Sequence, residues 1–595
     1  MTVAQMAALL HLRIGKISKG VTPLEFVYSG KSVLDSSVLI LTSRGNNADI
    51  LSAFRYAVDA EPRQLMAMCM KKRSHLSRFA QKFGYARFLD FELPTKEDGF
   101  LATNSLLASI TLLIRAYNSL VTESDVLPDD LTSVVGFRDY LDEYVTPLLS
   151  KSSIIVLYGY WGLPAAIDIE SKFTEAALGH IQIADYRNFG HGRHHWLAKR
   201  GIDTGVITLE TPEDTEIARK TLDLLPNNIS SIKIDTQLSG PAGSLDLLVK
   251  TMYLVNLAGK ANGINPGSPG VPKFGRSIYH LPLPYPSRFI GATRKMPRLE
   301  SIAILRKGKH LLLSDMDDRE VEYWHSAYRI FVRALEKACF GSVVLDYDGT
   351  LCDVDERYIG PSENIISELH RLLENGLIIG VATGRGSSVK NDLRRLIQRE
   401  YWGRVLIGYY SGSDIAPLND DQHPDKTVPT HPALEVIRNL IYDHGQLSLM
   451  ARFEYRPKQI TVESRNLSLW MQTRAILKDL IATCDVRNVH ILESDHSLDI
   501  IAPGVSKLNI VPFCQQVARS IGDPECVLCV GDKGEWPGND YEFLTSPYSL
   551  SVGTVSSNAN TCWNLAGPGH RGTQATMEYL KCIDSMGGIG HFRLR

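Results

Sequence analysis

Val343-Val344-Leu345-Asp346-Tyr347-Asp348-Gly349-Thr350 is the stretch that decides the fold of the carboxyl-terminal part of this 595-residue chain. An apolar run typical of a buried strand is followed at once by two carboxylates and a glycine turn. Ligands of open parallel sheets bind at the carboxyl ends of the strands. We therefore expect Asp346 and Asp348 to face a ligand. The alternative is that these aspartates only cap helices.

Two later apolar runs also end in polar residues. Ile378–Ala382 leads into Thr383-Gly-Arg, and Cys526–Val530 leads into Asp532, with Asp540 shortly after it. Lys507 lies between these two runs. Carboxylate oxygens are the ligands that Mg²⁺ prefers, and a metal ion with a lysine would neutralise a phosphate ester.

This ordered set resembles the motifs of the haloacid dehalogenase superfamily, over roughly residues 341–595. The resemblance implies a Mg²⁺-dependent phosphatase in which Asp346 attacks phosphorus and forms an aspartyl-phosphate. It implies that Asp348 protonates the leaving alkoxide and then activates water. Thr383 and Lys507 would hold the phosphoryl oxygens, with Gly384 and Arg385 also binding substrate. The implied metal ligands are Asp346, the backbone carbonyl of Asp348, Asp532 and Asp540.

The segment Ser387–Ser494 has strand and helix patterns of its own. It resembles the α/β cap that larger members of the superfamily fold over the site to select substrates and exclude water. Arg452, Arg456 and Lys458 are candidates for contacting a phosphate or a sugar from this cap. The alternative is that they are ordinary solvated charges on strands.

In the amino-terminal half, the apolar run Ser37–Thr42 ends in a polar turn whose backbone amides can cradle a phosphate. A second run, Ser153–Tyr158, opens into Gly159-Tyr-Trp-Gly162. These segments resemble two tandem copies of the sugar isomerase (SIS) fold of glucosamine-6-phosphate synthase and its relatives. The substrate-binding residues implied for the first turn are Thr42, Ser43, Arg44 and Asn47.

The same resemblance gives roles to Glu175 and His191. Glu175 would move a proton between sugar carbons, and His191 would help to open the sugar ring, because histidine titrates in the useful range. The alternative is that Glu175 lies on a solvated helix face and that the histidines around His191 are structural.

Two departures from this pattern bear on isomerase activity. Too few residues precede Thr22 for the family's first strand, so either the polypeptide starts upstream or the first sheet lacks an edge. In the second copy, Thr208–Glu213 places carboxylates where a serine-rich phosphate turn would fall, and these would repel phosphate.

Composition limits the class of protein. Hydrophobic residues make up 44% and charged residues 22% of the chain, as in soluble globular proteins. The 64 basic and 66 acidic side chains give a formal charge of −2, so we expect no nucleic acid or membrane as partner. Met1–Ile14 is expected to form an amphipathic helix and not a signal peptide, which predicts a cytoplasmic protein.

We expect an α/β fold of doubly wound parallel sheets, divided into several units. The predicted units are a first SIS-like unit, incomplete at its amino terminus (1–145), a second SIS-like unit (146–285), a linker with a connecting helix (286–340), a phosphatase core (341–386 and 495–595) and the inserted cap (387–494).

The leading functional hypothesis is a phosphatase acting on a phosphorylated sugar or related small metabolite. It is fused to a half that binds a sugar phosphate, with or without aldose-ketose isomerase activity. A second hypothesis makes the SIS-like half a non-catalytic sensor that controls the phosphatase. A third is an interaction protein in which both halves are vestigial. By resemblance, the SIS-like half is expected to form a homo-oligomer.

Overall fold

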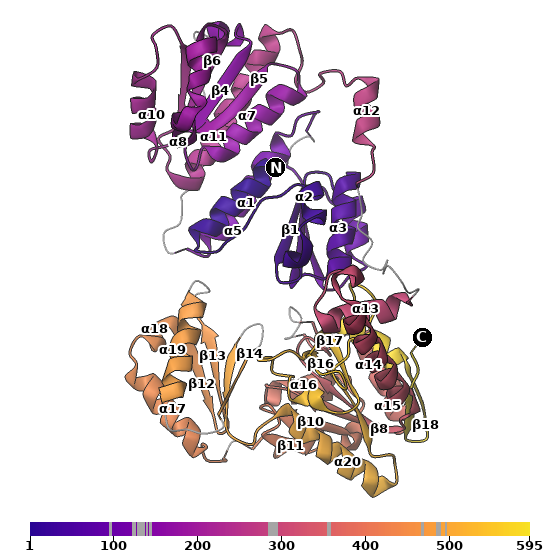
Figure 1. Cartoon of the computed structure of the whole chain (residues 1–595). Coiled ribbons are helices and arrows are strands. Elements are labelled where there is room, and N and C mark those ends of the chain that lie inside the picture. Colours follow the sequence, from indigo (N-terminus) through magenta and orange to yellow (C-terminus); the bar gives the residue numbers. More distant parts are fainter. Residues whose placement is uncertain are drawn as a thin grey trace.

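The computed structural model describes residues 1–94, 98–121, 127, 137, 141, 145–283, 296–353, 359–425, 427–465, 469–483, 489–493 and 497–594. The unit boundary predicted at residue 285 and the cap end predicted at residue 494 lie outside these residues. The described chain has an α/β fold with parallel sheets, which confirms the predicted fold class (Figure 1). Among the described residues, none of the helices combines the length and hydropathy that a bilayer span requires.

Two parallel sheets build the amino-terminal half. The first has strand order β1-β2-β3, and the second has strand order β5-β4-β6-β7. Their strands are β1 (Ser37–Thr42), β2 (Gln64–Cys69), β3 (Ala86–Asp90), β4 (Ser153–Tyr158), β5 (His180–Asp185), β6 (Thr204–Glu210) and β7 (Ser230–Asp235). β4 and β6 lie inside the second sheet and are buried along most of their length, as their continuous apolar sequences require.

The helices of this half pack on its sheets or connect them. They are α1 (Thr2–Arg13), α2 (Pro23–Val27), α3 (Ala48–Ala60), α4 (His75–Ala80), α5 (Asn104–Asn118), α7 (Leu163–Glu175), α8 (Tyr186–Asn188), α9 (His195–Arg200), α10 (Thr215–Asp223), α11 (Gly240–Ala261) and α12 (Lys273–Tyr279). The helix expected at the start of the chain is α1, which packs on α5 and α7 through Met6, Leu9 and Leu10.

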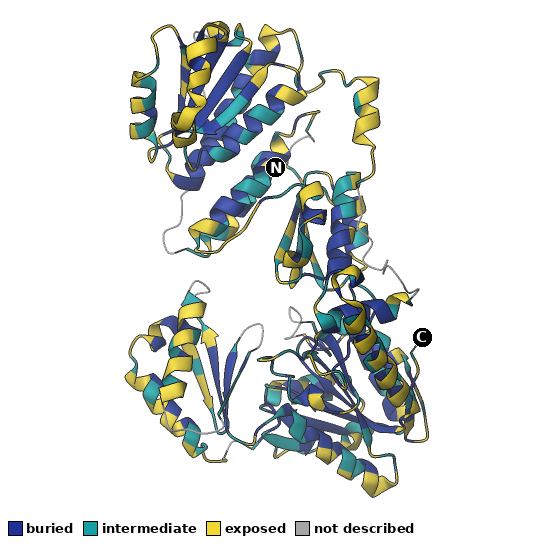
Figure 2. Ribbon diagram, viewed as in Figure 1, coloured by how far each residue is buried: buried dark blue, intermediate teal, exposed yellow. Residues whose placement is uncertain are grey.

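A sheet with strand order β11-β10-β9-β8-β16-β17 forms the core of the carboxyl-terminal half. Its strands, with the β18-β19 hairpin, are β8 (Phe340–Asp346), β9 (Ile378–Ala382), β10 (Val405–Tyr409), β11 (Asp414–Pro417), β16 (Cys526–Lys533), β17 (Ser549–Thr554), β18 (Ile583–Met586) and β19 (Ile589–Phe592). The surrounding helices are α15 (Glu363–Glu374), α16 (Ser387–Leu396), α20 (Ile510–Ile521) and α21 (Thr573–Lys581). β8 is central and buried at every residue (Figure 2).

An antiparallel sheet with order β12-β13-β15-β14 lies beside this core, where the cap was expected. Its elements are β12 (Ala451–Arg456), β13 (Gln459–Ser464), β14 (His490–Glu493), β15 (Leu498–Ile501), α17 (Pro432–Asp443), α18 (Leu447–Met450) and α19 (Trp470–Thr483). β13 and β15 are largely buried, whereas β12 is exposed at several residues (Figure 2).

Two helices join the halves. α14 (Asp318–Lys337) begins at Asp317, whose side chain accepts a hydrogen bond from the Glu320 amide, and it packs its aromatic face around Trp563. α13 (Arg298–Gly308) carries Arg306, whose guanidinium donates to Glu61 of the first unit at 2.6 and 2.9 Å. The same guanidinium donates to the Ala566 and Gly567 carbonyls at 2.7 and 3.0 Å, so it links the first sheet unit to the carboxyl-terminal core.

Replacing Arg306 should therefore destabilise the protein strongly. Arg306→Ala leaves the Glu61 carboxylate buried without its main cationic partner, which typically costs about 3–5 kcal/mol. Arg298→Ala is the matched control, because that arginine is 61% exposed and its pair with Asp59, at 3.4 Å, contributes less than about 1 kcal/mol. Urea unfolding measures both variants, and equal shifts of the midpoint would contradict the role assigned to Arg306.

Candidate active site

The carboxyl ends of three neighbouring strands bring the predicted phosphatase residues together. β8 ends at Asp346, β9 leads directly into Thr383, and β16 carries Asp532 close to its end. The strand registers pair Asp346 with Ala382 and Leu345 with Val530. Residues far apart in the sequence therefore meet at one edge of the sheet.

Lys507 sits between two carboxylates at this edge. Its Nζ contacts Asp346 Oδ1 and donates to Asp540 Oδ1 at 2.7 Å. All three side chains are buried, with residue exposures of 3% for Lys507, 2% for Asp346 and 0% for Asp540. The second oxygen of Asp540 accepts the backbone amides of Asp532 and Lys533 at 2.9 and 3.2 Å, which fixes its orientation.

The charges of this cluster determine its titration. Burial, followed by the nearby Asp540 charge, raises the pKa of Asp346 to about 7, although Lys507 opposes the shift. Burial alone would lower the pKa of Lys507, but the two carboxylates outweigh it and raise that pKa. For Asp540 the contact with Lys507 outweighs burial, so its pKa is lowered.

The same edge has the donor set of a divalent cation site. Ligand oxygens of Asp346, Asp532 and Asp540 all lie within 4.8 Å of one another. Gly349 makes room for this group, because its φ is +84° and a Cβ there would lie 2.5 Å from Asp532 Oδ2. These hard oxygen donors fit Mg²⁺. The Asp348 side chain is not in the cluster, so its predicted contribution would come from its backbone carbonyl.

The predicted substrate residues surround Asp348. Thr383 is buried, and its hydroxyl oxygen accepts the Arg385 amide at 3.0 Å. The Arg385 guanidinium donates to Asp348 Oδ1 at 3.3 Å and lies 5.2 Å from the centre of the Tyr347 ring. The structure therefore places Asp348, Thr383 and Arg385 next to one another.

The loop at Tyr410 and Ser411, which was not predicted from the sequence, holds the backbone of Thr383 by a hydrogen bond. After β10, Tyr410 and Ser411 adopt positive φ values of 47° and 59°, which are rare for residues other than glycine. The Ser411 amide donates to the Thr383 carbonyl at 2.8 Å, and the Tyr410 amide donates to the Arg385 carbonyl at 3.1 Å. The only signal in the sequence is Ser411-Gly412-Ser413 directly after an apolar run.

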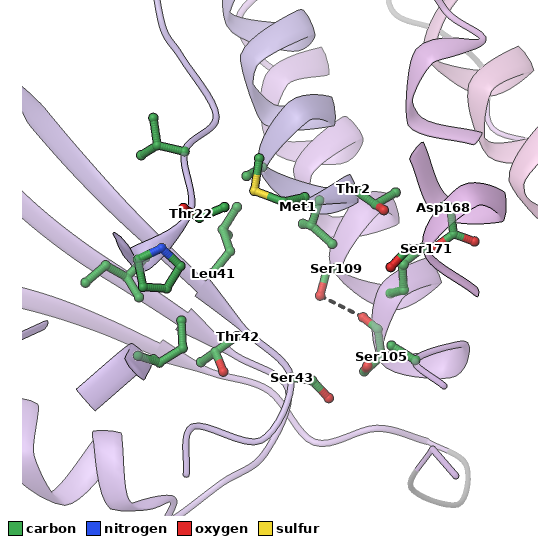
Figure 3. A pocket seen from close by; sticks show the side chains of 18 of the residues that line it. Met1, Thr2, Thr22, Leu41, Thr42, Ser43, Ser105, Ser109, Asp168 and Ser171 are labelled. Carbon is green, nitrogen blue, oxygen red and sulfur yellow. Dashed lines mark hydrogen bonds between the residues drawn. The ribbon is translucent and has the colours of Figure 1, made fainter. Parts of the chain in front are cut away.

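The amino-terminal half contains a pocket of about 400 Å³ between β1, α1, α5 and α7 (Figure 3). Thr42 and Ser43 line it from the end of β1, and Glu175 lines it from α7. Asp168 forms a buried ion pair with Lys172 in its wall, at 2.5 Å. Glu175 itself is exposed and accepts a hydrogen bond from Ser171 at 2.5 Å.

The other residues predicted for this half do not line the pocket. Arg44 donates to the Asp98 carbonyl at 2.5 Å, and Asn47 caps α3 by accepting the Asp49 amide at 2.8 Å. His191 is exposed in the short helical turn Phe189–Arg193. Within one chain, the structure brings Glu175 together with Thr42 and Ser43, but not with His191.

Comparison with known proteins finds similar solved structures for both halves. The sequence matches no protein-family profile and no curated protein. A sugar phosphatase of haloacid dehalogenase subclass IIB is 17% identical, with a TM-score of 0.27, over 35% of this chain and 86% of that protein. Tagatose-6-phosphate ketose/aldose isomerase from Escherichia coli is 15% identical, with a TM-score of 0.38, over 45% of this chain and 81% of that protein.

A third structure is the carboxyl-terminal domain of glucosamine-fructose-6-phosphate aminotransferase from Francisella tularensis. It is 14% identical, with a TM-score of 0.34, over 43% of this chain and 81% of that domain. Both predicted resemblances thus have counterparts among solved structures. These similarities concern the fold, so the chemistry of this chain follows from its own residues.

Mg²⁺ binding should depend on both Asp532 and pH. Asp532→Asn should weaken binding at least about tenfold, whereas Asp421→Asn, at a side chain that is 85% exposed, should not change it. Because the pKa of Asp346 is raised to about 7, its carboxyl group is ionised above that pH and protonated below it. Affinity should therefore fall about tenfold for each pH unit below 7.

Calorimetric titration of the metal-free protein with MgCl₂, at about pH 6 and about pH 8, measures both effects. Binding that is independent of pH, or unchanged by Asp532→Asn, would contradict this assignment of the ligands.

Proposed function

We propose that the carboxyl-terminal half is a Mg²⁺-dependent phosphatase that acts on a phosphorylated sugar or a related small metabolite. The observation that carries this proposal is the buried Lys507 held between Asp346 and Asp540, next to Asp532. A fixed positive charge beside a carboxylate nucleophile is what an anionic ester needs before it can be attacked. We further propose that the protein acts in the cytoplasm, without nucleic acid or membrane partners.

The residues of the site have the following roles in this reaction. One Asp346 oxygen attacks phosphorus while the bond from phosphorus to the leaving oxygen breaks, which gives an aspartyl-phosphate. Asp348 donates its proton to the leaving oxygen and then takes a proton from the water that attacks the aspartyl-phosphate. The bond from phosphorus to Asp346 breaks, which releases inorganic phosphate and restores the carboxylate.

Other groups hold the ester during both steps. Thr383 and Lys507 bind the phosphoryl oxygens, and Gly384 and Arg385 contact the substrate beside them. Mg²⁺, when held by Asp346, the Asp348 carbonyl, Asp532 and Asp540, supplies positive charge that offsets the repulsion between carboxylate and phosphate.

Asp346→Asn tests this mechanism directly. Purified protein with MgCl₂ should release phosphate from a panel of sugar phosphates and aryl phosphates, measured as inorganic phosphate. The variant keeps the shape of the side chain but removes the nucleophile, so turnover should fall at least about a thousandfold. Its melting temperature should change little, because Lys507 keeps its contact with the Asp540 carboxylate. Unchanged turnover in Asp346→Asn would contradict this mechanism.

For the amino-terminal half, we propose that its pocket binds a sugar phosphate. Thr42, Ser43 and Glu175 line one cavity, which supports this proposal. In isomerisation Glu175 would be the base, and His191, which is exposed and outside the pocket of its own chain, would come from a second copy in a homo-oligomer. Fusion of the two halves is useful if the product of one is the substrate of the other.

One set of contacts favours the second hypothesis, a ligand-regulated phosphatase. α3 has Ile50 and Ala53 in the pocket wall and is followed by Glu61 at the interface with the phosphatase core. Glu61 accepts the Gly569 amide at 2.8 Å, and Arg571 donates to the Glu61 carbonyl at 2.9 Å. A shift of α3 would therefore change the position of Glu61 and of the residues that it contacts, Gly569 and Arg571.

From there the contacts reach the catalytic loop. The Gln574 side chain donates to the Lys82 carbonyl and accepts the Gly84 amide, both at 3.0 Å. Two residues later, the Thr576 hydroxyl donates to the Thr350 carbonyl at 2.8 Å, in the turn that follows Asp346 and Asp348. Ligand binding in the pocket has a contiguous physical route to the nucleophile loop.

Gln574→Ala should therefore uncouple the two halves. If the pocket regulates the phosphatase, a sugar phosphate that is not hydrolysed should change the rate on an aryl phosphate at least about fivefold in the wild type. The variant should keep the basal rate and lose this response, whereas Gln516→Ala, on the exposed face of α20, should keep both.

The same ligands can be tested for proton exchange at the second sugar carbon. Exchange that is lost in Glu175→Gln would make the half an isomerase. A response to ligand that survives in Gln574→Ala would contradict the proposed route.

A further inference from the structure

The cap presents a buried polar cluster to the phosphatase site. Thr461 on β13 is paired in register with Asp499 on β15, and the Thr461 hydroxyl donates to Asp499 Oδ1 at 2.7 Å. Gln459 Nε2 also donates to Asp499 Oδ1, at 2.9 Å. Asp499 is only 6% exposed, so its carboxyl group is buried where the cap meets the core.

The second oxygen of this carboxylate has no such partner. Among the residues that the structure describes, none donates a hydrogen bond to Asp499 Oδ2. This oxygen lies next to Gly384, because a Cβ on Gly384 would be 4.0 Å from it. Gln459 Nε2 and Ser411 Oγ converge on the same point, at 4.0 and 3.8 Å. An unused acceptor therefore lies beside the loop of Thr383.

The Asp499 Oδ2 oxygen is therefore available to accept a hydrogen bond from a ligand. Burial raises the pKa of Asp499, while Thr461, Gln459, Arg456 and Lys507 oppose that shift. A carboxylate in this position repels a second phosphate or carboxylate on the substrate. It binds hydroxyl groups well, because a hydroxyl supplies the missing donor.

We propose that Asp499 is a specificity-determining residue that accepts a hydrogen bond from a hydroxyl of the leaving group. The substrate class is then a phosphorylated sugar or polyol whose leaving group is neutral and hydroxyl-bearing, and not a bisphosphate or a phosphorylated carboxylic acid. This inference rests on the proposed phosphatase reaction. It identifies a hydroxyl of the leaving group as the part of the substrate that the cap recognises.

Asp499→Asn tests the inference, because it keeps the size of the side chain and removes the charge. With a hexose 6-phosphate, kcat/KM should fall at least about tenfold, as expected for the loss of a hydrogen bond to a charged group. With 4-nitrophenyl phosphate, whose leaving group carries no further hydroxyl, kcat/KM should change less than about threefold. Glu463→Gln, an exposed carboxylate on β13, is the matched control and should leave both values unchanged.

An equal loss on both esters, or no loss on either, overturns the inference. So does a wild type that hydrolyses the aryl ester and no sugar or polyol phosphate, although the phosphatase assignment then stands. If the wild type hydrolyses no ester at all, both the proposed function and this inference are wrong.

A measurement on the wild type covers the case in which Asp499→Asn does not fold. In a series of deoxyhexose 6-phosphates, at least one analogue should lose about tenfold in kcat/KM relative to the parent sugar. Equal rates across the series would overturn the inference.

Discussion

The contact of Lys507 with Asp346 and Asp540 is the interaction on which the carboxyl-terminal half depends. Three formal charges are buried together, and each is tolerable only because the others are present. Asp346 lies at the end of β8, Asp540 lies in the turn after β16, and Lys507 lies in the segment that returns from the cap to the core after β15. If any one of these segments were displaced, an uncompensated charge would remain in the core.

The return segment also joins the cap to the site proposed for catalysis. Asp499 lies on the last cap strand to leave the sheet, β15, and Lys507 follows shortly after it in the core. A cap carboxylate and a core lysine therefore occupy one short stretch of chain. Elsewhere, Arg306 and Gln574 connect the first sheet unit to the segment that supports Thr350.

Much of the fold could be predicted because the strands concerned are continuous apolar runs. β1, β4 and β9 span the predicted residues, and Asp346, Thr383 and Asp532 meet because parallel strands align their carboxyl ends. β5 and β7 were not predicted, since they mix polar and apolar residues and owe their place to neighbouring strands.

The cap cluster and the loop at Tyr410 and Ser411 depend on contacts between segments distant in sequence, which no local pattern reveals. The pocket of the amino-terminal half also depends on contacts between segments that are distant in the sequence. Its walls come from packing of α1, α5 and α7 against β1, and this packing leaves Arg44 and Asn47 engaged elsewhere.

In the proposed reaction Asp346 becomes covalently phosphorylated. The most direct measurement is to quench the enzyme during turnover of a phosphate ester, reduce it with borohydride and sequence its peptides by mass spectrometry. Borohydride converts an aspartyl-phosphate into homoserine, so we expect homoserine at position 346 and unmodified aspartate at position 348. Phosphate release without homoserine at position 346, or with homoserine at another aspartate, would contradict the proposed reaction.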